Sequence, residues 1–137
     1  MTFDKDEYSR WLSQAKQTLE SAENDVKGKF YNWACFKSQQ AAEFALKGLL
    51  AGLGEVAMGH SLLKLADQLS DCEVDCTVII DFARKLDKFY IPTRYPDAHP
   101  AGSPNQYYTS EDSKFALSYA KKVISFVGGI SDGLGKD

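Results

Sequence analysis

Apolar residues recur three and four positions apart along several stretches of the chain, a spacing that places them on one side of an α-helix. The first stretch runs from Asp4 to about Val26, and Gly28 can end that helix in the left-handed conformation that glycine adopts at little cost. A second stretch runs from about Tyr31 to Leu53. Because the link between them is short, the two helices should form an antiparallel pair.

Glycines at positions 52, 54 and 59 predict a loop, after which a shorter helix begins. Either His60 or Ser61 can cap that helix at its N-terminus. A fourth helix is predicted from about Thr77 to Phe89, and it must stop by Ile91 because Pro92 disfavours a helical conformation in the residue before it.

The last predicted helix follows Thr109, which forms a near capping-box pattern with Asp112. Gly128 and Gly129 are predicted to end it, and the polar residues 131–137 are predicted to be a flexible tail. Strand signals are absent from the sequence. The predicted class is therefore all-α, an up-and-down antiparallel bundle of four to five helices that forms one domain over residues 1–130.

Composition and charge restrict the kind of protein and its possible ligands. Apolar residues make up 44% of the chain and charged residues 26%, close to the average of globular domains. No run approaches the roughly 20 apolar residues of a membrane-spanning helix, and the N-terminus lacks the layout of a signal peptide. The net charge of −3 provides no broad field to attract nucleic acid, so any contact with a polyanion must come from a local patch.

Three cysteines, Cys35, Cys72 and Cys76, are an odd number at irregular spacing, which argues against a disulfide framework and fits a reducing compartment. We therefore expect a cytoplasmic protein without membrane contact. Cys72 and Cys76 have no second ligand pair nearby, so no metal site is expected.

Residues 91–108 contain four prolines and a glycine, too many for regular structure, and long loops in compact domains are often functional. Four separate pieces of sequence now stand in a defined order: a first helix containing Trp11, the run Gln39-Gln40-Ala41-Ala42-Glu43 with Lys47, the run His60-Ser61-Leu62, and the run from Phe89 to Asp97. In this order the chain resembles the HEPN family (higher eukaryotes and prokaryotes nucleotide-binding). The resemblance implies a helical bundle, usually a homodimer, connected with RNA cleavage, nucleotide binding and partnership with minimal nucleotidyltransferases.

Many members of the family that cut RNA carry an arginine and a histidine separated by four to six residues, and here Arg94 and His99 are separated by four. Imidazole can transfer a proton near neutral pH and guanidinium can hold phosphate oxygens, so the pair is expected to act without metal or other cofactor. Departures from the family pattern are Tyr95, where a polar residue often follows the arginine, and the stiffening Pro96 and Pro100. The alternative is an arginine that only holds the loop together.

Further candidates complete the expected nucleotide- or RNA-binding set, which comprises Arg94, Tyr95, Asp97, Gln40, Glu43 and Lys47. Gln40, Glu43 and Lys47 share one side of the second helix, where they either meet the loop or form only an intrahelical ion pair. Asp97 either pairs with Arg94 or orients His99. His60 is interpreted as a structural residue at the start of a helix. Tyrosines around the loop either pack or stack on bases.

Two functions are compatible with these residues. One is a metal-independent endoribonuclease, the toxin of a toxin–antitoxin pair, which acts as a homodimer through Arg94 and His99. The other is a non-catalytic module that holds a nucleotide or docks a minimal nucleotidyltransferase, the expected antitoxin, as its partner. The first requires Arg94 and His99 side by side in an exposed basic cleft, whereas the second tolerates a buried Arg94.

Overall fold

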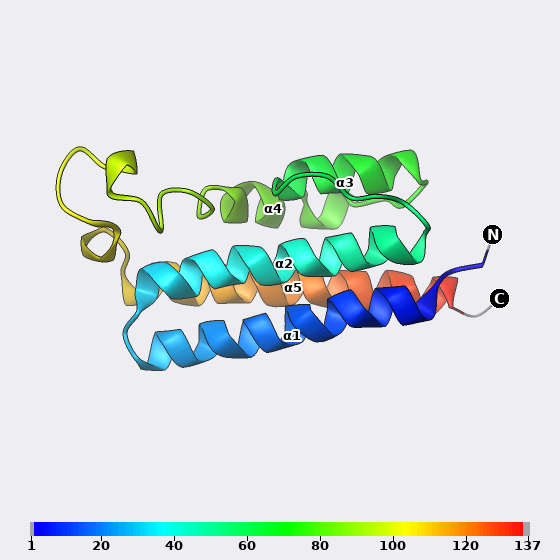
Figure 1. Cartoon of the computed structure of the whole chain (residues 1–137), viewed down its shortest axis with the longest axis horizontal. Helices are drawn as coiled ribbons and strands as arrows, with labels where there is room; N and C mark the ends of the chain where they lie inside the picture. The colour runs from blue at the N-terminus through cyan, green and yellow to red at the C-terminus, as the bar shows by residue number, and fades with distance from the viewer. Residues whose placement is uncertain (1, 136–137) are drawn as a thin grey trace.

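Five α-helices make up the fold in the computed structural model, which describes residues 2–135. The three long helices are α1 (Lys5–Lys27), α2 (Tyr31–Gly52) and α5 (Ser110–Leu134). Two shorter helices, α3 (Leu62–Asp71) and α4 (Ile80–Asp87), form a second layer over α2 and α5 (Figure 1). No strand occurs among the described residues, so the predicted all-α class is confirmed.

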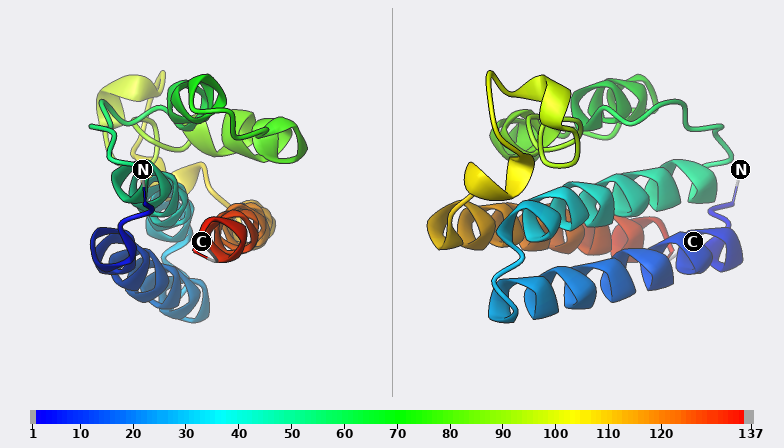
Figure 2. Two further views of the ribbon diagram at one scale, coloured as in Figure 1. Left: turned by 90° about the vertical axis from the view of Figure 1, so that its right-hand side faces the viewer. Right: turned by 60° about the vertical axis from the view of Figure 1, so that its left-hand side comes forward.

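Helix α2 is the centre of the molecule because both layers pack on it. In the end-on view of Figure 2, α1, α2 and α5 occupy the corners of a triangle, and α3 and α4 lie over α2 and α5 on the side away from α1, with α4 packed mainly on α5. Accordingly, most of the helix is buried, including four of its five alanines and the leucines Leu46, Leu49 and Leu50. No helix among residues 2–135 is both long enough and apolar enough to cross a membrane.

The ends of the helices agree with local capping patterns at several positions. Asp4 caps α1 by accepting a hydrogen bond from the amide of Glu7 (3.1 Å). At the start of α5, the predicted capping box is present, because the Thr109 hydroxyl accepts from the amide of Asp112 and the Asp112 carboxylate accepts from the amide of Thr109. Helix α1 ends at Lys27 with Gly28 as its C-cap, as predicted, but Gly28 is right-handed (φ −81°) and the left-handed residue is Lys29 (φ 66°), so only the conformation predicted for Gly28 was wrong.

Helix α3 begins with two capping residues. Of the two predicted caps, Ser61 accepts from the amide of Lys64, and His60 does not cap. The carboxylate of Asp87, at the end of α4, accepts from the amides of Leu62 and Leu63 at 2.8 and 3.1 Å. Asp87 therefore ties the end of α4 to the start of α3, next to His60.

Two short 3-10 turns, η2 (Pro96–Ala98) and η3 (Pro104–Gln106), interrupt the proline-rich segment between α4 and α5. A third, η1 (Thr77–Ile79), precedes α4, so the predicted fourth helix starts as a 3-10 turn. The proline-rich segment lies at the end of the bundle opposite the two termini (Figure 1).

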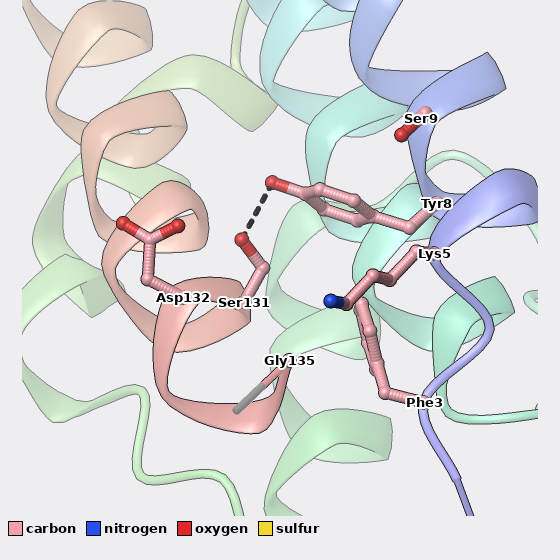
Figure 3. Close-up of a pocket in the computed structure, with 7 residues that line it drawn as sticks. All are labelled: Phe3, Lys5, Tyr8, Ser9, Ser131, Asp132 and Gly135. Carbon is pink, nitrogen blue, oxygen red and sulfur yellow. Dashed lines mark hydrogen bonds between the residues drawn. The ribbon is translucent and has the colours of Figure 1, made fainter. Parts of the chain in front are cut away.

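Helix α5 does not end at Gly128 and Gly129, as predicted, but continues to Leu134. Its last turns pack on the start of α1, where the buried Ser131 hydroxyl donates to the hydroxyl of Tyr8 at 2.9 Å (Figure 3). This tertiary contact outweighs the low helix propensity of two glycines, which costs about 1 kcal/mol each. The predicted tail of residues 131–137 is thus helical over 131–134, and residues 136 and 137 lie outside the described part.

Candidate functional site

Arg94 lies on a cluster of three aromatic rings. Its guanidinium carbon is 4.1 Å from the ring centre of Phe36, 4.7 Å from that of Tyr90 and 4.9 Å from that of Tyr95. Its Nε donates to the carbonyl oxygen of Tyr90 at 2.9 Å. Within residues 2–135 no carboxylate forms an ion pair with Arg94. The guanidinium is therefore held in place by rings and backbone while its charge is left unneutralised.

The segment that carries Arg94 is anchored on the first turns of α2. The buried side chain of Asn32 donates from Nδ2 to the carbonyl oxygen of Thr93 at 3.0 Å. Thr93 is itself fully buried, and its hydroxyl donates to the carbonyl oxygen of Phe89 at 2.6 Å. Since Asn32 and Phe36 lie four residues apart on α2, the same side of this helix holds both the backbone before Arg94 and its guanidinium.

Further along that side of α2 lies a buried carboxylate with three partners. The side chain of Glu43 is only 2% exposed, and it accepts from Lys47 Nζ at 3.1 Å and from Gln40 Nε2 at 3.2 Å. The third partner is His60, whose Nδ1 lies 3.2 and 3.3 Å from the two carboxylate oxygens. We call these four residues, Gln40, Glu43, Lys47 and His60, the Glu43 cluster.

His60 is the exposed member of the Glu43 cluster. Its side chain is 55% exposed, although Gln39 Nε2 fixes its backbone by donating to its carbonyl oxygen at 2.8 Å. The imidazole stacks on the ring of Tyr90, with centroids 4.8 Å apart and planes 18° apart. Tyr90 therefore contacts both His60 and Arg94, and it joins the Glu43 cluster to the aromatic cluster.

His99 is bound differently from His60. Its Nε2 lies 2.6 Å from the carbonyl oxygen of Pro92, and because a carbonyl only accepts, Nε2 must be the donor. The ring stacks on Tyr107 at 4.2 Å and meets Tyr108 edge-on at 6.2 Å. His99 thus closes the proline-rich segment on itself, and its Nε2 is committed to that contact.

Of the predicted site residues, the structure brings together two groups. Gln40, Glu43 and Lys47 are hydrogen-bonded to one another, and Arg94 contacts Tyr95. Asp97 is exposed and forms an ion pair with neither Arg94 nor His99 among the described residues, so neither interpretation of its role has a contact to support it.

Two members of the site were missed by the sequence reasoning. His60 was interpreted as structural, and Phe36 was not among the expected site residues. The helical spacing from Asn32 and Phe36 to Gln40 and Glu43 is the signal that marks a common side of α2. No comparable signal in the sequence connects His60 with Glu43.

The cysteines offer no nucleophile to the site. Burial raises the pKa of Cys35 to about 12 and that of Cys76 to about 11, with smaller contributions from nearby carboxylates. The pKa of Cys72 is also raised, by partial burial and by Glu55 and Asp71. All three are free thiols, and residues 2–135 contain no group of three or more side chains arranged to hold a metal ion.

We expect iodoacetamide at pH 8 to modify Cys72 before the other two thiols in the folded protein. Cys35 and Cys76 should react only on unfolding, because they are buried and their raised pKa leaves little thiolate. Peptide mass spectrometry after a short exposure, with a urea-unfolded sample as control, measures the order of modification. Early modification of Cys35 would contradict its burial in the core.

Comparison with known proteins agrees with this architecture. A family model for the HEPN domain matches residues 8–130, so the chain belongs to the HEPN domain family. The crystal structure of TT1696 from Thermus thermophilus is 45% identical in sequence, with 89% of this chain and 96% of that one covered at a TM-score of 0.85. No curated protein matches the chain.

Two further solved structures belong to the same family. ST0689, an archaeal HEPN homologue, is 37% identical and covers 89% of this chain and 95% of its own at a TM-score of 0.74. The HEPN domain protein TM0613 from Thermotoga maritima is 36% identical and covers 90% of this chain and 98% of its own at a TM-score of 0.70. The HEPN resemblance inferred from the sequence is thereby confirmed.

Proposed function

We propose that this HEPN protein binds a nucleotide unit, free or within an RNA strand, with Arg94 as the ligand of its phosphate. The observation that carries this proposal is the guanidinium of Arg94, which is fixed over three rings and lacks a carboxylate partner among residues 2–135. A planar guanidinium with free donors suits a phosphate group. In a chain of net charge −3, such a local cation is what attraction of a polyanion requires.

Exposed aromatic rings next to Arg94 supply surfaces for a base. Tyr95 is 49% exposed, and Trp33, which packs edge-on against Phe36, is 43% exposed. Bases stack on such rings with little dependence on their sequence, and each stack contributes about 1–3 kcal/mol. The site therefore offers one phosphate ligand and two stacking surfaces, which fits single-stranded RNA or a nucleotide.

Cleavage through Arg94 and His99 is less well supported than binding. The Nε2 of His99 donates to the Pro92 carbonyl, so in the neutral ring only Nδ1 can take a proton, and among residues 2–135 no hydrogen bond links His99 to Arg94. Homodimer formation and a minimal nucleotidyltransferase as partner remain predictions from the family resemblance.

The experiment that tests this function is fluorescence anisotropy with a labelled single-stranded RNA of mixed sequence. Replacing Arg94 with alanine should weaken binding about 10- to 100-fold, the loss expected for a charge-assisted hydrogen bond to phosphate. The Arg94 variant should also lower the salt dependence by about one phosphate contact. Competition with a nucleoside triphosphate shows whether a free nucleotide occupies the same site.

Two controls make the result specific. Arg10→Ala removes an exposed arginine that pairs with Glu7 on α1 and should leave binding unchanged. His99→Gln keeps a donor for the Pro92 carbonyl and should also bind normally. Equal binding by wild type and Arg94→Ala, or loss of binding in Arg10→Ala to the same degree, would refute the proposal.

A further inference from the structure

Helices α4 and α5 pack side by side, and lysines lie over a row of stacked aromatic rings where they meet. The centroid of the Tyr119 ring is 5.6 Å from that of Phe82 on α4 and 6.2 Å from that of Phe115 on α5, and the planes are 24° and 14° apart. Lys85 Nζ lies 5.1 Å from the Tyr119 centroid, and Lys122 Nζ lies 4.9 Å from that of Phe82. Each helix therefore places a cation on a ring of the other.

The cations of α5 are not neutralised by carboxylates. Within residues 2–135, Lys114 and Lys122 form no ion pair, and Lys121 forms only a long one, at 3.8 Å from Glu23. Residues 113–131 contain neither aspartate nor glutamate. In a chain of net charge −3, this stretch of α5 is therefore a local excess of positive charge.

The two carboxylates of α4 are bound to other groups. Asp81 forms an ion pair with Arg84 of the same helix, and Asp87 accepts from the first amides of α3. Lys85, four positions after Asp81, forms no ion pair within the described part of the chain. The charge of Lys85 therefore adds to that of the α5 lysines.

Hydrogen-bond donors continue in a line along α5. A shallow groove on this helix is lined by Lys114, Leu117, Ser118, Lys121, Lys122 and Ser125. Four of these residues, at positions 114, 118, 121 and 125, are spaced four, three and four apart, so they follow one side of the helix over about 16 Å. Phosphate oxygens only accept hydrogen bonds, so a line of ammonium and hydroxyl groups without carboxylates suits a strand of several phosphates. We call this groove, together with the stacked rings, the lysine–aromatic face.

The exposed end of the ring stack favours a nucleic acid as the ligand of this face. Phe115 is 53% exposed and directly follows Lys114, the first cation of the line. A base stacks on such a ring while its phosphates contact the lysines. An acidic protein segment would need only the lysines, and a second copy of the chain would bring two faces of like charge together.

We propose that the lysine–aromatic face binds a single-stranded nucleic acid, with Lys114, Lys121 and Lys122 on successive phosphates and Phe115 stacked on a base. The inference goes beyond the proposed function, because it concerns a different surface and does not depend on Arg94. It also specifies the ligand as a strand, since a free nucleotide is too short to contact the whole line of donors.

The test measures fluorescence anisotropy of the full chain with short labelled RNA and DNA strands of the same mixed sequence. Replacing Lys114, Lys121 and Lys122 together with glutamine should weaken binding about tenfold or more at low salt. It should also lower the slope of log K against log salt by about 2, because each phosphate contact on a single strand contributes about 0.7. Binding of either strand with this loss supports the proposal, and the tighter strand identifies the preferred sugar.

A matched control carries the same change of charge on other helices. Lys5, Lys16 and Lys64 are exposed lysines of α1 and α3 without an ion pair among residues 2–135. Their joint replacement with glutamine should leave the affinity within about twofold of wild type. Equal loss of binding in the two triple variants would show that only the net charge matters and would refute a defined surface.

The role of Phe115 is tested with a strand that lacks bases. Phe115→Ala should weaken binding of the normal strand about 5- to 100-fold, the usual contribution of one stacked base, and should bind an abasic strand of equal length as wild type does. If Phe115→Ala binds the normal strand like wild type, and poly-glutamate of equal charge displaces that strand as well as unlabelled RNA does, the face binds acidic segments and the proposal is overturned.

The outcomes separate this inference from the proposed function of Arg94. If the Lys114, Lys121 and Lys122 variant binds the strand like wild type while Arg94→Ala does not, the lysine–aromatic face is refuted and the Arg94 site stands. If the lysine variant loses binding while Arg94→Ala keeps it, the proposed function fails and this inference stands.

Discussion

Replacing Glu43 with alanine is expected to lower the free energy of unfolding by about 3 kcal/mol, as breaking a buried ion pair typically does. The carboxylate is 2% exposed and binds Lys47, Gln40 and His60, so its removal leaves three donors without their common acceptor. Most of the cost comes from Lys47, because its side chain is only 13% exposed and its ammonium group would be left buried without a partner of opposite charge. Urea unfolding monitored by circular dichroism measures the change.

A double variant distinguishes the cost of an orphaned charge from the value of the ion pair. Glu43→Leu combined with Lys47→Met removes both charges and keeps apolar volume, and such replacements are often neutral or stabilising. We expect this double variant to recover most of the stability lost in Glu43→Ala. If the free energy of unfolding of Glu43→Ala lies within about 0.5 kcal/mol of wild type, as for an ordinary surface substitution, the buried ion pair of Glu43 does not stabilise the fold as argued.

Features that depend on neighbours within a few residues were predictable from the sequence. The cap at Ser61 and the capping box of Thr109 and Asp112 join residues three positions apart. Both partners therefore lie within one short stretch of sequence, where the pattern can be recognised. Helical periodicity likewise placed Gln40, Glu43 and Lys47 on one side of the second helix. The fourth helix ends before Ile91, as predicted from Pro92, because the effect of a proline on the preceding residue is local.

Features that depend on distant contacts were not predictable. The end of α5 is determined by the packing of its last turns on α1, including the bond between Ser131 and Tyr8 across 123 positions. Gly128 and Gly129 have low helix propensity and predicted a helix end, but the helix continues through them because its last turns pack on α1.

The same reason explains the site. Glu43 and His60 are 17 positions apart, and Arg94 meets Phe36 from a segment far along the chain. Arg94 and His99 are close in the sequence and were predicted to act as a pair. In the structure their side chains bind different backbone carbonyls, those of Tyr90 and Pro92. Helical periodicity predicts on which side of a helix a residue lies. It does not predict which residue of a distant loop packs against that side.

Substituting Gly48 with alanine is expected to destabilise the bundle, whereas the same change at Gly52 should have a smaller effect. A Cβ at Gly48 would lie 2.8 Å from the Cβ of Trp11 and 3.3 Å from the carbonyl oxygen of Tyr8. These atoms belong to, or are fixed to, the backbone of α1, so α1 and α2 would have to separate. A Cβ at Gly52 would instead meet the ring of Phe3, a partly exposed side chain that precedes α1 and can turn aside.

The balance of two effects gives the size of the change at Gly48. Overpacking of a close contact costs about 1–3 kcal/mol, and replacing glycine with alanine inside a helix returns about 1 kcal/mol. The net loss at Gly48 should therefore reach about 2 kcal/mol, while at Gly52 the gain in helix propensity should offset much of the cost. Chemical unfolding of the two variants in parallel measures the difference. Equal stability of the two variants would mean that α1 and α2 can approach each other closely even with a side chain at position 48. The interface between these two helices, the largest in the fold, would then adjust more easily than its packing indicates.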